Sequence, residues 1–190
     1  MEIALSVLLG IGLAAACGFR VFVPPLVMSV AALAGHLELA EGFEWIGTWP
    51  ALIAFSCATL LEVVAYYVPW LDNALDAIAT PAAVVGGIVV TAGCITDVTP
   101  LLKWTLAVIA GGGMAAVVQL LTVKARALSS MFTAGSANFL VSTGETVSST
   151  LVAVVSVVLP VAVGIFLLLL AYLAWRVTRR KTAPKAAPSR

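Results

Sequence analysis

The sequence predicts an all-α, polytopic transmembrane helical bundle. The mean hydropathy is +1.13, 62% of the 190 residues are apolar and only 10% are charged, whereas soluble domains have a charged fraction of about 25%. Long apolar runs exclude a barrel of about 10-residue alternating strands, and helices then remain to satisfy the backbone in lipid. At roughly 20 residues a crossing, the chain is long enough for about six crossings.

The first apolar segment is longer than one membrane span. It runs from about residue 3 to 33, and a Gly-Phe-Arg run at 18–20 and two prolines at 24–25 interrupt it. We therefore expect a broken or kinked helix. The loop at 36–47 contains three glutamates and neither lysine nor arginine. Because cytoplasmic loops are rich in lysine and arginine, we expect this loop to lie outside.

Two spans follow the acidic loop. The second span is predicted over residues 49–68, with Pro69 closing it. Thr80 followed by Pro81 is typical of an N-cap with proline at the first helical position, so we expect a helix to begin there. That third span reaches about residue 96 and contains three glycines, which favour close helix packing.

The fourth span predicts the topology. It covers residues 104–123, after a turn at 97–103, and Lys124 and Arg126 end it at a cytoplasmic boundary. Six of the ten basic residues lie in the last fifteen positions, which indicates a cytoplasmic tail. Two crossings must then lie between Arg126 and the tail, giving six crossings with both termini cytoplasmic. Re-entrant half-helices are the alternative.

Residues 127–150 are unusually polar for a span, with ten serines or threonines. Five small or polar residues recur at intervals of three, four, three and four, at Gly135, Asn138, Ser142, Glu145 and Ser149. In a helix they form one stripe that cannot face lipid. Alternatively, the helix breaks near the glycine at 144 and exposes its backbone to the same interior.

A weak internal similarity suggests an inverted 3+3 repeat with broken helices. A Gly-Leu-Ala-Ala run at 12–15 precedes Arg20, and a Gly-Met-Ala-Ala run at 113–116 precedes Lys124 and Arg126. Three crossings separate the two runs, so the halves would be inverted relative to each other. Inverted repeats are typical of transporters, although glycine and alanine matches are common by chance in membrane helices.

Ionisable residues within apolar spans are candidates for function. Each costs about 2.5 to 3.5 kcal/mol at the centre of a lipid-facing helix, so it must pair or line a wet cavity. Buried ion pairs that fix helix packing are the structural alternative. The predicted substrate or ion pathway contains Arg20, Glu62, Tyr66, Gln119, Lys124, Arg126, Thr133, Asn138, Ser142 and Glu145.

Catalytic and metal sites are not expected. The sequence has no zinc-binding, P-loop, dinucleotide or Ser-His-Asp motif, so we predict no catalytic residue, no enzyme activity and no cofactor. Asp72 and Asp76, in a predicted amphipathic connection, lie one turn apart but lack a third ligand; they are weak metal candidates, and a solvated face is the simpler reading. Without the tail, four basic and nine acidic residues give about −5, which excludes a nucleic-acid footprint.

Several motifs resemble the DUF4126 family of small bacterial integral membrane proteins, over about residues 8–165. They are Gly18-Phe19-Arg20, Glu62 through Pro69, Asp72, Asp76, Lys124-x-Arg126, and Thr133-Ala134-Gly135-x-x-Asn138 with Ser142 and Glu145. Because that family is defined without an assigned function, the resemblance implies a membrane protein and no activity. The family's usual pattern has charged residues near Tyr66 and at the places of Thr80 and Thr146, so here hydroxyl contacts are expected to replace some charge pairs.

We therefore expect a transmembrane domain at 1–177 and a basic, disordered cytoplasmic tail at 178–190, in a multi-pass protein of the bacterial inner membrane. The predicted function is transport of a small polar or ionic solute, or of a lipid head group, with the acids carrying protons if the transport is proton-coupled. A non-catalytic scaffold or accessory subunit is the alternative. The expected partners are the lipid bilayer and an unidentified solute, and a homodimer is a further option.

Overall fold

The computed structural model describes residues 2–67, 69–133, 138–162, 164, 165 and 169, and the side chains of all of these except 2 and 69–77. All the regular structure in these ranges is helical, which confirms the predicted all-α class. The elements are α1 (Glu2–Cys17), α2 (Val23–Leu33), a 3₁₀ turn (Glu44–Gly47), α3 (Trp49–Ala65), α4 (Pro69–Cys94), α5 (Pro100–Leu106), a π segment (Ala107–Gly112), α6 (Gly113–Thr133) and α7 (Asn138–Val158).

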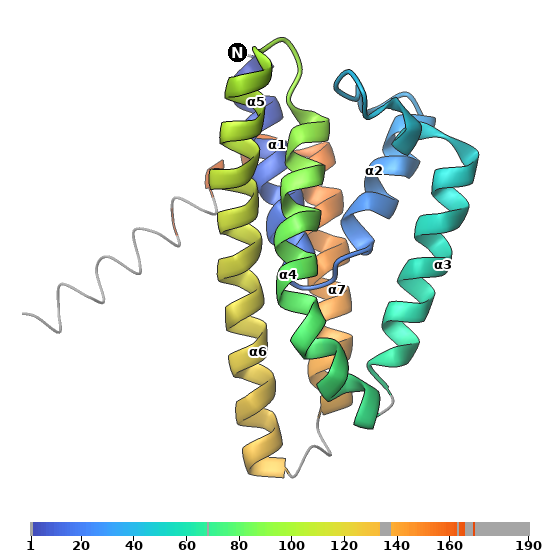
Figure 1. Ribbon diagram of the computed structural model, residues 1–190, viewed down its shortest axis with the longest axis vertical. Helices are drawn as coiled ribbons and strands as arrows, with labels where there is room; N and C mark the ends of the chain where they lie inside the picture. Colours follow the sequence, from blue (N-terminus) through green and yellow to red (C-terminus); the bar gives the residue numbers. More distant parts are fainter. Residues whose placement is uncertain (1, 68, 134–137, 163, 166–168, 170–190) are drawn as a thin grey trace, which may run out of the picture.

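The helices run along one long axis between two ends (Figure 1). We call the end that carries loops 34–48 and 95–99 the hairpin end, and the end where α3, α6 and the start of α7 meet the turn end. The chain from Pro100 to Thr133 is one continuous helical segment, and it and α7 are each long and apolar enough to cross a membrane.

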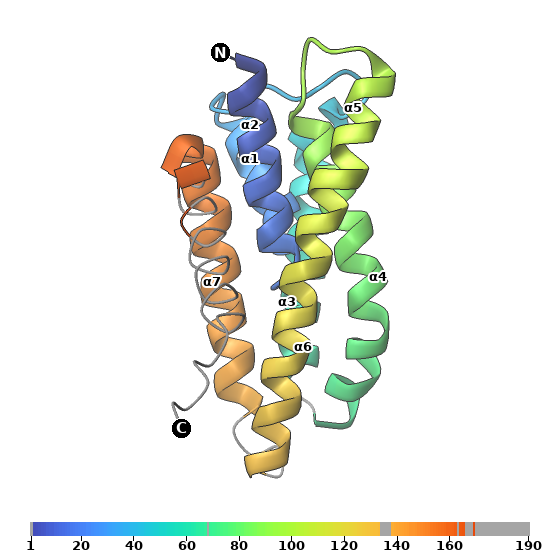
Figure 2. The ribbon, with the colours of Figure 1, turned by 90° about the vertical axis from the view of Figure 1, so that its left-hand side faces the viewer.

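The first apolar segment forms a helical hairpin, in which α1 and α2 lie side by side at the hairpin end (Figures 1 and 2). Both arms follow the same stretch of α4: Gly86 faces Cys17 and Val21, next to the tip at residues 18–22, and Gly93 faces Met28 farther up α2. The break was predicted, and the reversal fits the alternative of re-entrant half-helices better than the preferred six crossings. Helix α1 starts at the end of the bundle that carries the acidic loop, whereas the six-crossing topology put the N-terminus and that loop on opposite sides of a membrane.

The boundaries of the middle helices differ from the prediction. Helix α4 begins at Pro69 and continues through Thr80 and Pro81, so the predicted helix start at Thr80 is wrong. Pro81 lies on an exposed face of α4, where the missing N–H removes one backbone hydrogen bond without ending the helix. The other long segment does not end at Lys124 and Arg126 but continues to Thr133.

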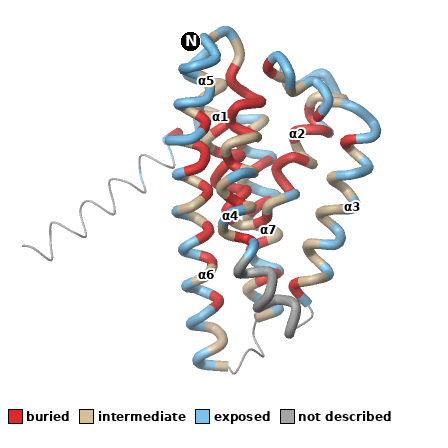
Figure 3. Tube along the Cα trace, in the orientation of Figure 1, coloured by how far each residue is buried: buried red, intermediate tan, exposed pale blue. Residues whose placement is uncertain are grey.

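Buried residues gather in the half of the bundle near the hairpin end (Figure 3), where close backbone approach holds the helices together. A Cβ atom on Gly87 of α4 would lie 2.6 Å from the Ala115 Cβ and 2.9 Å from the Gly111 carbonyl oxygen. A Cβ on Gly18, at the hairpin tip, would lie 2.7 Å from the Ala115 carbonyl oxygen. The glycines predicted for packing therefore pack within one chain.

Polarity along α6 and α7 is the reverse of that in a soluble bundle. The buried face of α7 contains Ser142, Glu145, Ser149, Ala153 and Ser156. Its exposed residues include Phe139, Leu140, Val147, Leu151, Val154, Val155 and Val158. The predicted polar stripe is thus confirmed for its members from 142 onward, on a helix that continues through Gly144, and Gly135 lies outside the described residues.

Candidate functional site

Arg20 lies at the hairpin tip with its side chain among residues of α7. Its Nε donates to the Thr146 hydroxyl at 3.1 Å, and its Nη2 donates to the Ser142 carbonyl at 2.9 Å and to the Ser142 hydroxyl at 2.5 Å. The residue is 1% exposed. The hairpin brings Arg20 here, because α1 ends at Cys17 and the tip that follows it lies against α7.

Two arginines share the carboxylate of Glu145. Oε2 of Glu145 accepts a hydrogen bond from Nη2 of Arg126, and Nη2 of Arg20 lies 3.4 Å from the same oxygen. Arg126 is 6% exposed and Glu145 5%. Removing one partner from a buried ion pair costs about 3 to 5 kcal/mol because the other charge stays uncompensated. The two helices α6 and α7 and the hairpin tip are therefore linked through one carboxylate.

Tyr66, at the end of α3, completes this arrangement. Its ring centroid lies 4.1 Å from the Arg20 guanidinium carbon and 4.2 Å from that of Arg126. The face of an aromatic ring attracts cations, so the ring offsets part of the repulsion between the arginines. Thr146 meets Arg20 through its hydroxyl, as expected, whereas Tyr66 meets both arginines through its ring. We call Arg20, Tyr66, Arg126, Ser142, Glu145 and Thr146 the polar cluster.

Glu62 has a different role at the same hairpin tip. Its Oε1 accepts the Val21 amide at 2.8 Å and its Oε2 accepts the Phe22 amide at 3.1 Å. Phe22 is the N-cap residue of α2, whose own side chain makes no capping bond. The Glu62 carboxylate thus satisfies two amides that form no helical hydrogen bond at the chain reversal. Its negative charge also interacts favourably with the positive N-terminal end of the α2 dipole.

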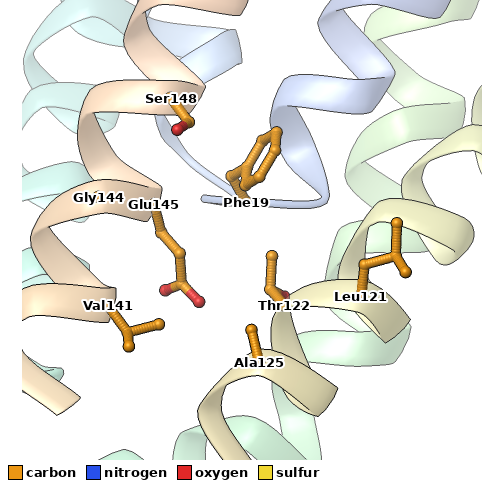
Figure 4. A pocket seen from close by; sticks show the side chains of 8 residues that line it. All are labelled: Phe19, Leu121, Thr122, Ala125, Val141, Gly144, Glu145 and Ser148. Atoms are coloured by element: carbon orange, nitrogen blue, oxygen red, sulfur yellow. The ribbon is translucent and has the colours of Figure 1, made fainter. Parts of the chain in front are cut away.

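A cavity of about 310 Å³ opens between α6 and α7, beside the hairpin tip (Figure 4). Figure 4 shows the Glu145 carboxylate pointing from α7 towards Thr122 and Ala125 of α6. The eight described residues that line it are Phe19, Leu121, Thr122, Ala125, Val141, Gly144, Glu145 and Ser148. Glu145 therefore belongs to both the cavity and the polar cluster.

The other predicted pathway residues lie apart from this centre. Gln119 is buried on α6, whereas Lys124 is exposed on the same helix. Near the turn end, the Thr133 hydroxyl donates to the Ser129 carbonyl at 2.7 Å, and Asn138 Nδ2 donates to the Ser130 hydroxyl at 3.1 Å. The side chains of the weak metal candidates, Asp72 and Asp76, fall outside the described residues, although both positions belong to α4.

Sequence reasoning missed three polar contributors. Thr146 was expected only as a replacement for a charged residue, and Thr122 and Ser148 of the cavity were not singled out. Thr146 follows Ser142 by four residues, and Thr122 precedes Arg126 by four, so helical spacing from residues already chosen would have found both. Ser148 lies three residues after Glu145 and follows from the same rule.

Nη1 of Arg20 has no hydrogen-bond partner within the described part of the chain, and it is buried together with the rest of that side chain. A guanidinium presents donors in a planar fork that suits an oxyanion with two oxygens. The cluster therefore retains an unused donor beside the carboxylate that it already binds.

Comparisons with known proteins gave a family and no individual relative. Neither the search of curated proteins nor that of solved structures found a match. The family described as "Domain of unknown function (DUF4126)" matches residues 7–180. That range includes most of the hairpin, Glu62 and the whole polar cluster, and the chain therefore belongs to the DUF4126 family.

Proposed function

We propose that the protein is a multi-pass membrane protein in which α3, α4, the continuous segment from α5 to α6, and α7 cross the bilayer, while α1 and α2 enter and leave on one side. The outward apolar and inward polar residues of α6 and α7 support this. The proposal counts four crossings in the described residues in place of six. It omits the inverted repeat, because Arg20 lies in a hairpin tip and Arg126 within an unbroken helix.

The acidic loop supports an orientation with the hairpin end outside and the turn end in the cytoplasm. Lys124 is exposed in the second half of α6, the helix that ends at the turn end (Figure 1), in agreement with the positive-inside rule. The basic tail at 178–190 lies outside the described residues, and its cytoplasmic place stays a prediction. So do the bacterial inner membrane and a homodimer.

Within this membrane protein, we propose transport of a small polar or ionic solute through the polar cluster. One observation carries the proposal: a re-entrant tip brings Arg20 to Arg126 and Glu145 part-way along the bundle, where a cavity reaches the Glu145 carboxylate. Broken helices with ends near the midplane, which bind ions through helix termini and charged side chains, are a recurrent design of transporters.

A structural role is the second candidate, and the same contacts favour it. Glu145 pairs with both arginines, as a carboxylate does when it only fixes helix packing. The two candidates differ in what neutralising this carboxylate does. A transporter shows a flux that this substitution abolishes, whereas a scaffold shows no flux and the substitution lowers its stability alone.

The test uses the purified protein in liposomes under an osmotic gradient, with swelling followed by stopped-flow light scattering. The solutes are formate, acetate, phosphate, chloride, glycerol and urea. We expect swelling at least tenfold faster than in empty liposomes for a subset of them, and loss of that increase in Glu145→Gln. The matched control is Glu38→Gln, which neutralises an exposed loop acid and should keep the flux. Empty-liposome rates for every solute, with a destabilised Glu145→Gln, would instead support the scaffold.

A further inference from the structure

We infer that Arg20 and Arg126 form a binding site for a small oxyanion, and that the carboxylate of Glu145 is a tethered occupant of that site which leaves it on taking up a proton. This inference rests on the proposed transport function and names its substrate class and coupling. The oxyanion is a monovalent carboxylate or a phosphate group.

The first argument is the chemistry of the present occupant. A glutamate carboxylate is itself an oxyanion, and one of its oxygens meets Nη2 of both arginines. Arg20 Nη1, next to that contact, is buried and has no hydrogen-bond partner in the described ranges. A free oxyanion in the same place has oxygens available for Nη1 as well, which makes a forked contact that Glu145 leaves incomplete.

The second argument is the route. Glu145 lines the cavity between α6 and α7, whereas Arg20 and Arg126 are not among its described lining residues. An anion that enters the cavity therefore meets the carboxylate before it reaches the arginines. The cavity, about 310 Å³, is large enough for about ten water molecules at the volume of liquid water. A hydrated formate or phosphate fits in that space, and so does the displaced Glu145 side chain.

The third argument is charge balance. Among the described residues, the charged groups at or beside the Glu145 carboxylate are Arg20 from the hairpin tip, Arg126 from α6 and Glu62 of α3, which binds the adjacent tip amides; the Tyr66 ring packs on both arginines. The two arginines therefore balance the two carboxylates, and this balance is kept when one anion enters and one proton binds to Glu145. An anion without the proton leaves one excess negative charge inside the bundle, at a cost of several kcal/mol. One proton therefore accompanies each anion.

The experiment measures equilibrium binding of formate and of inorganic phosphate to the full-length protein in detergent by calorimetry, between pH 5 and 8. For the wild type we expect the Kd for formate to fall about tenfold for each pH unit of acidification while Glu145 is ionised. Glu145→Gln should bind formate more tightly than the wild type at pH 8, with a Kd that does not change with pH. Glu38→Gln should behave like the wild type.

Three results would overturn the inference: no formate binding to the wild type at any pH, a wild-type Kd independent of pH, or a Gln variant that binds no more tightly than the wild type. Should Glu145→Gln fail to fold, the dependence of the wild-type Kd on pH decides the outcome alone. Binding in detergent requires no transport. If binding depends on pH and the liposomes show no flux, the proposed function is rejected and the binding site is kept. If the liposomes show flux and binding does not depend on pH, the proposed function is kept and the binding site is rejected.

Nanodiscs distinguish a soluble oxyanion from an anionic lipid headgroup. If phosphatidylglycerol nanodiscs weaken formate binding at least tenfold relative to nanodiscs of zwitterionic phosphatidylcholine, the anionic headgroup occupies the arginine site. Equal affinities in the two lipids support a soluble oxyanion. If the formate affinity of Arg126→Leu depends on lipid charge to the same extent as that of the wild type, the dependence arises from the membrane surface. That result overturns binding at this site.

Discussion

Near the hairpin end, α1, α4 and the π segment meet through glycines and alanines, whereas nearer the turn end α3, α6 and α7 meet through charges and hydroxyls. Gly87 lies against Ala115 and the Gly111 carbonyl in the first region. In the second, Arg126 and Glu145 pair across two helices. The hairpin tip belongs to both, since Gly18 packs on α6 while Arg20 enters the polar cluster.

The difference concerns what each region can tolerate. An apolar contact through glycine fails by steric overlap and responds to a single methyl group. A buried charge cluster fails by imbalance, so it responds to the loss of one charge and is unaffected by a neutral change outside it. We therefore expect substitutions in the two regions to lower the free energy of unfolding by different amounts, and four variants test this.

The largest loss is expected for Arg126→Leu. It leaves Glu145 with less compensation in a buried place, and we expect the free energy of unfolding to fall by about 3 to 5 kcal/mol in an SDS titration of mixed micelles. Lys124→Leu is the matched control, because Lys124 is an exposed cation on the same helix. Equal losses in the two variants would mean that the cluster contributes nothing specific.

Glu62→Leu should cost somewhat less. It removes the carboxylate that accepts hydrogen bonds from the Val21 and Phe22 amides, and a hydrogen bond to a charged group contributes about 1.5 to 3 kcal/mol. Because the loss is local to the hairpin tip, hydrogen exchange at these two amides should accelerate before that of α6. Unchanged protection at the tip would contradict the role assigned to Glu62.

Gly87→Ala tests the apolar region with one methyl group. The added Cβ lies 2.6 Å from the Ala115 Cβ, and we expect a loss of about 1 to 3 kcal/mol in the same titration. Gly144→Ala is the matched control, since a Cβ there meets nothing within 4 Å. In the control, higher helix propensity should leave stability equal or raise it by about 0.5 to 1 kcal/mol. A neutral Gly87→Ala would show that α4 is able to move away from the π segment.

Thr91→Val should have the smallest effect. The Thr91 hydroxyl donates to the Gly10 carbonyl at 3.0 Å inside the hairpin half, and valine keeps the shape of the side chain. A single neutral hydrogen bond contributes about 0.5 to 1.5 kcal/mol. A loss as large as that of Arg126→Leu would place a polar contact at the centre of a region that we describe as apolar.

Local sequence patterns predicted which residues share a face of a single helix. The interval of three and four residues from Ser142 to Ser149 requires only helical geometry, and the same geometry put Arg126 on the face of Gln119. The long apolar runs likewise predicted the all-helical class, because helices satisfy their own backbone groups, whereas the place of the bundle in a membrane stays a proposal.

Long-range contacts decided what the sequence did not predict. The break near Arg20 is visible in the sequence, but the reversal of the chain depends on Glu62, about forty residues later, which satisfies the freed amides. Pro81 matched a helix start by local rules, and the surrounding bundle kept α4 continuous. The convergence of Tyr66 on two arginines depends on where α3 ends relative to α6, which no local spacing encodes.

The π segment from Ala107 to Gly112 has a consequence for chain length. Its hydrogen bonds join residues five apart, so it accommodates more residues per turn than the α-helix on either side. Deleting one residue there would restore α geometry and leave α5 in about its present orientation relative to α6, because a π turn holds one residue more than an α turn over about the same rotation. Lys103, whose ammonium donates to the Glu41 carbonyl, would then stay beside the acidic loop. The same one-codon deletion within α6 has no such extra residue to remove and would rotate the helix on one side of it by about 100° relative to the other.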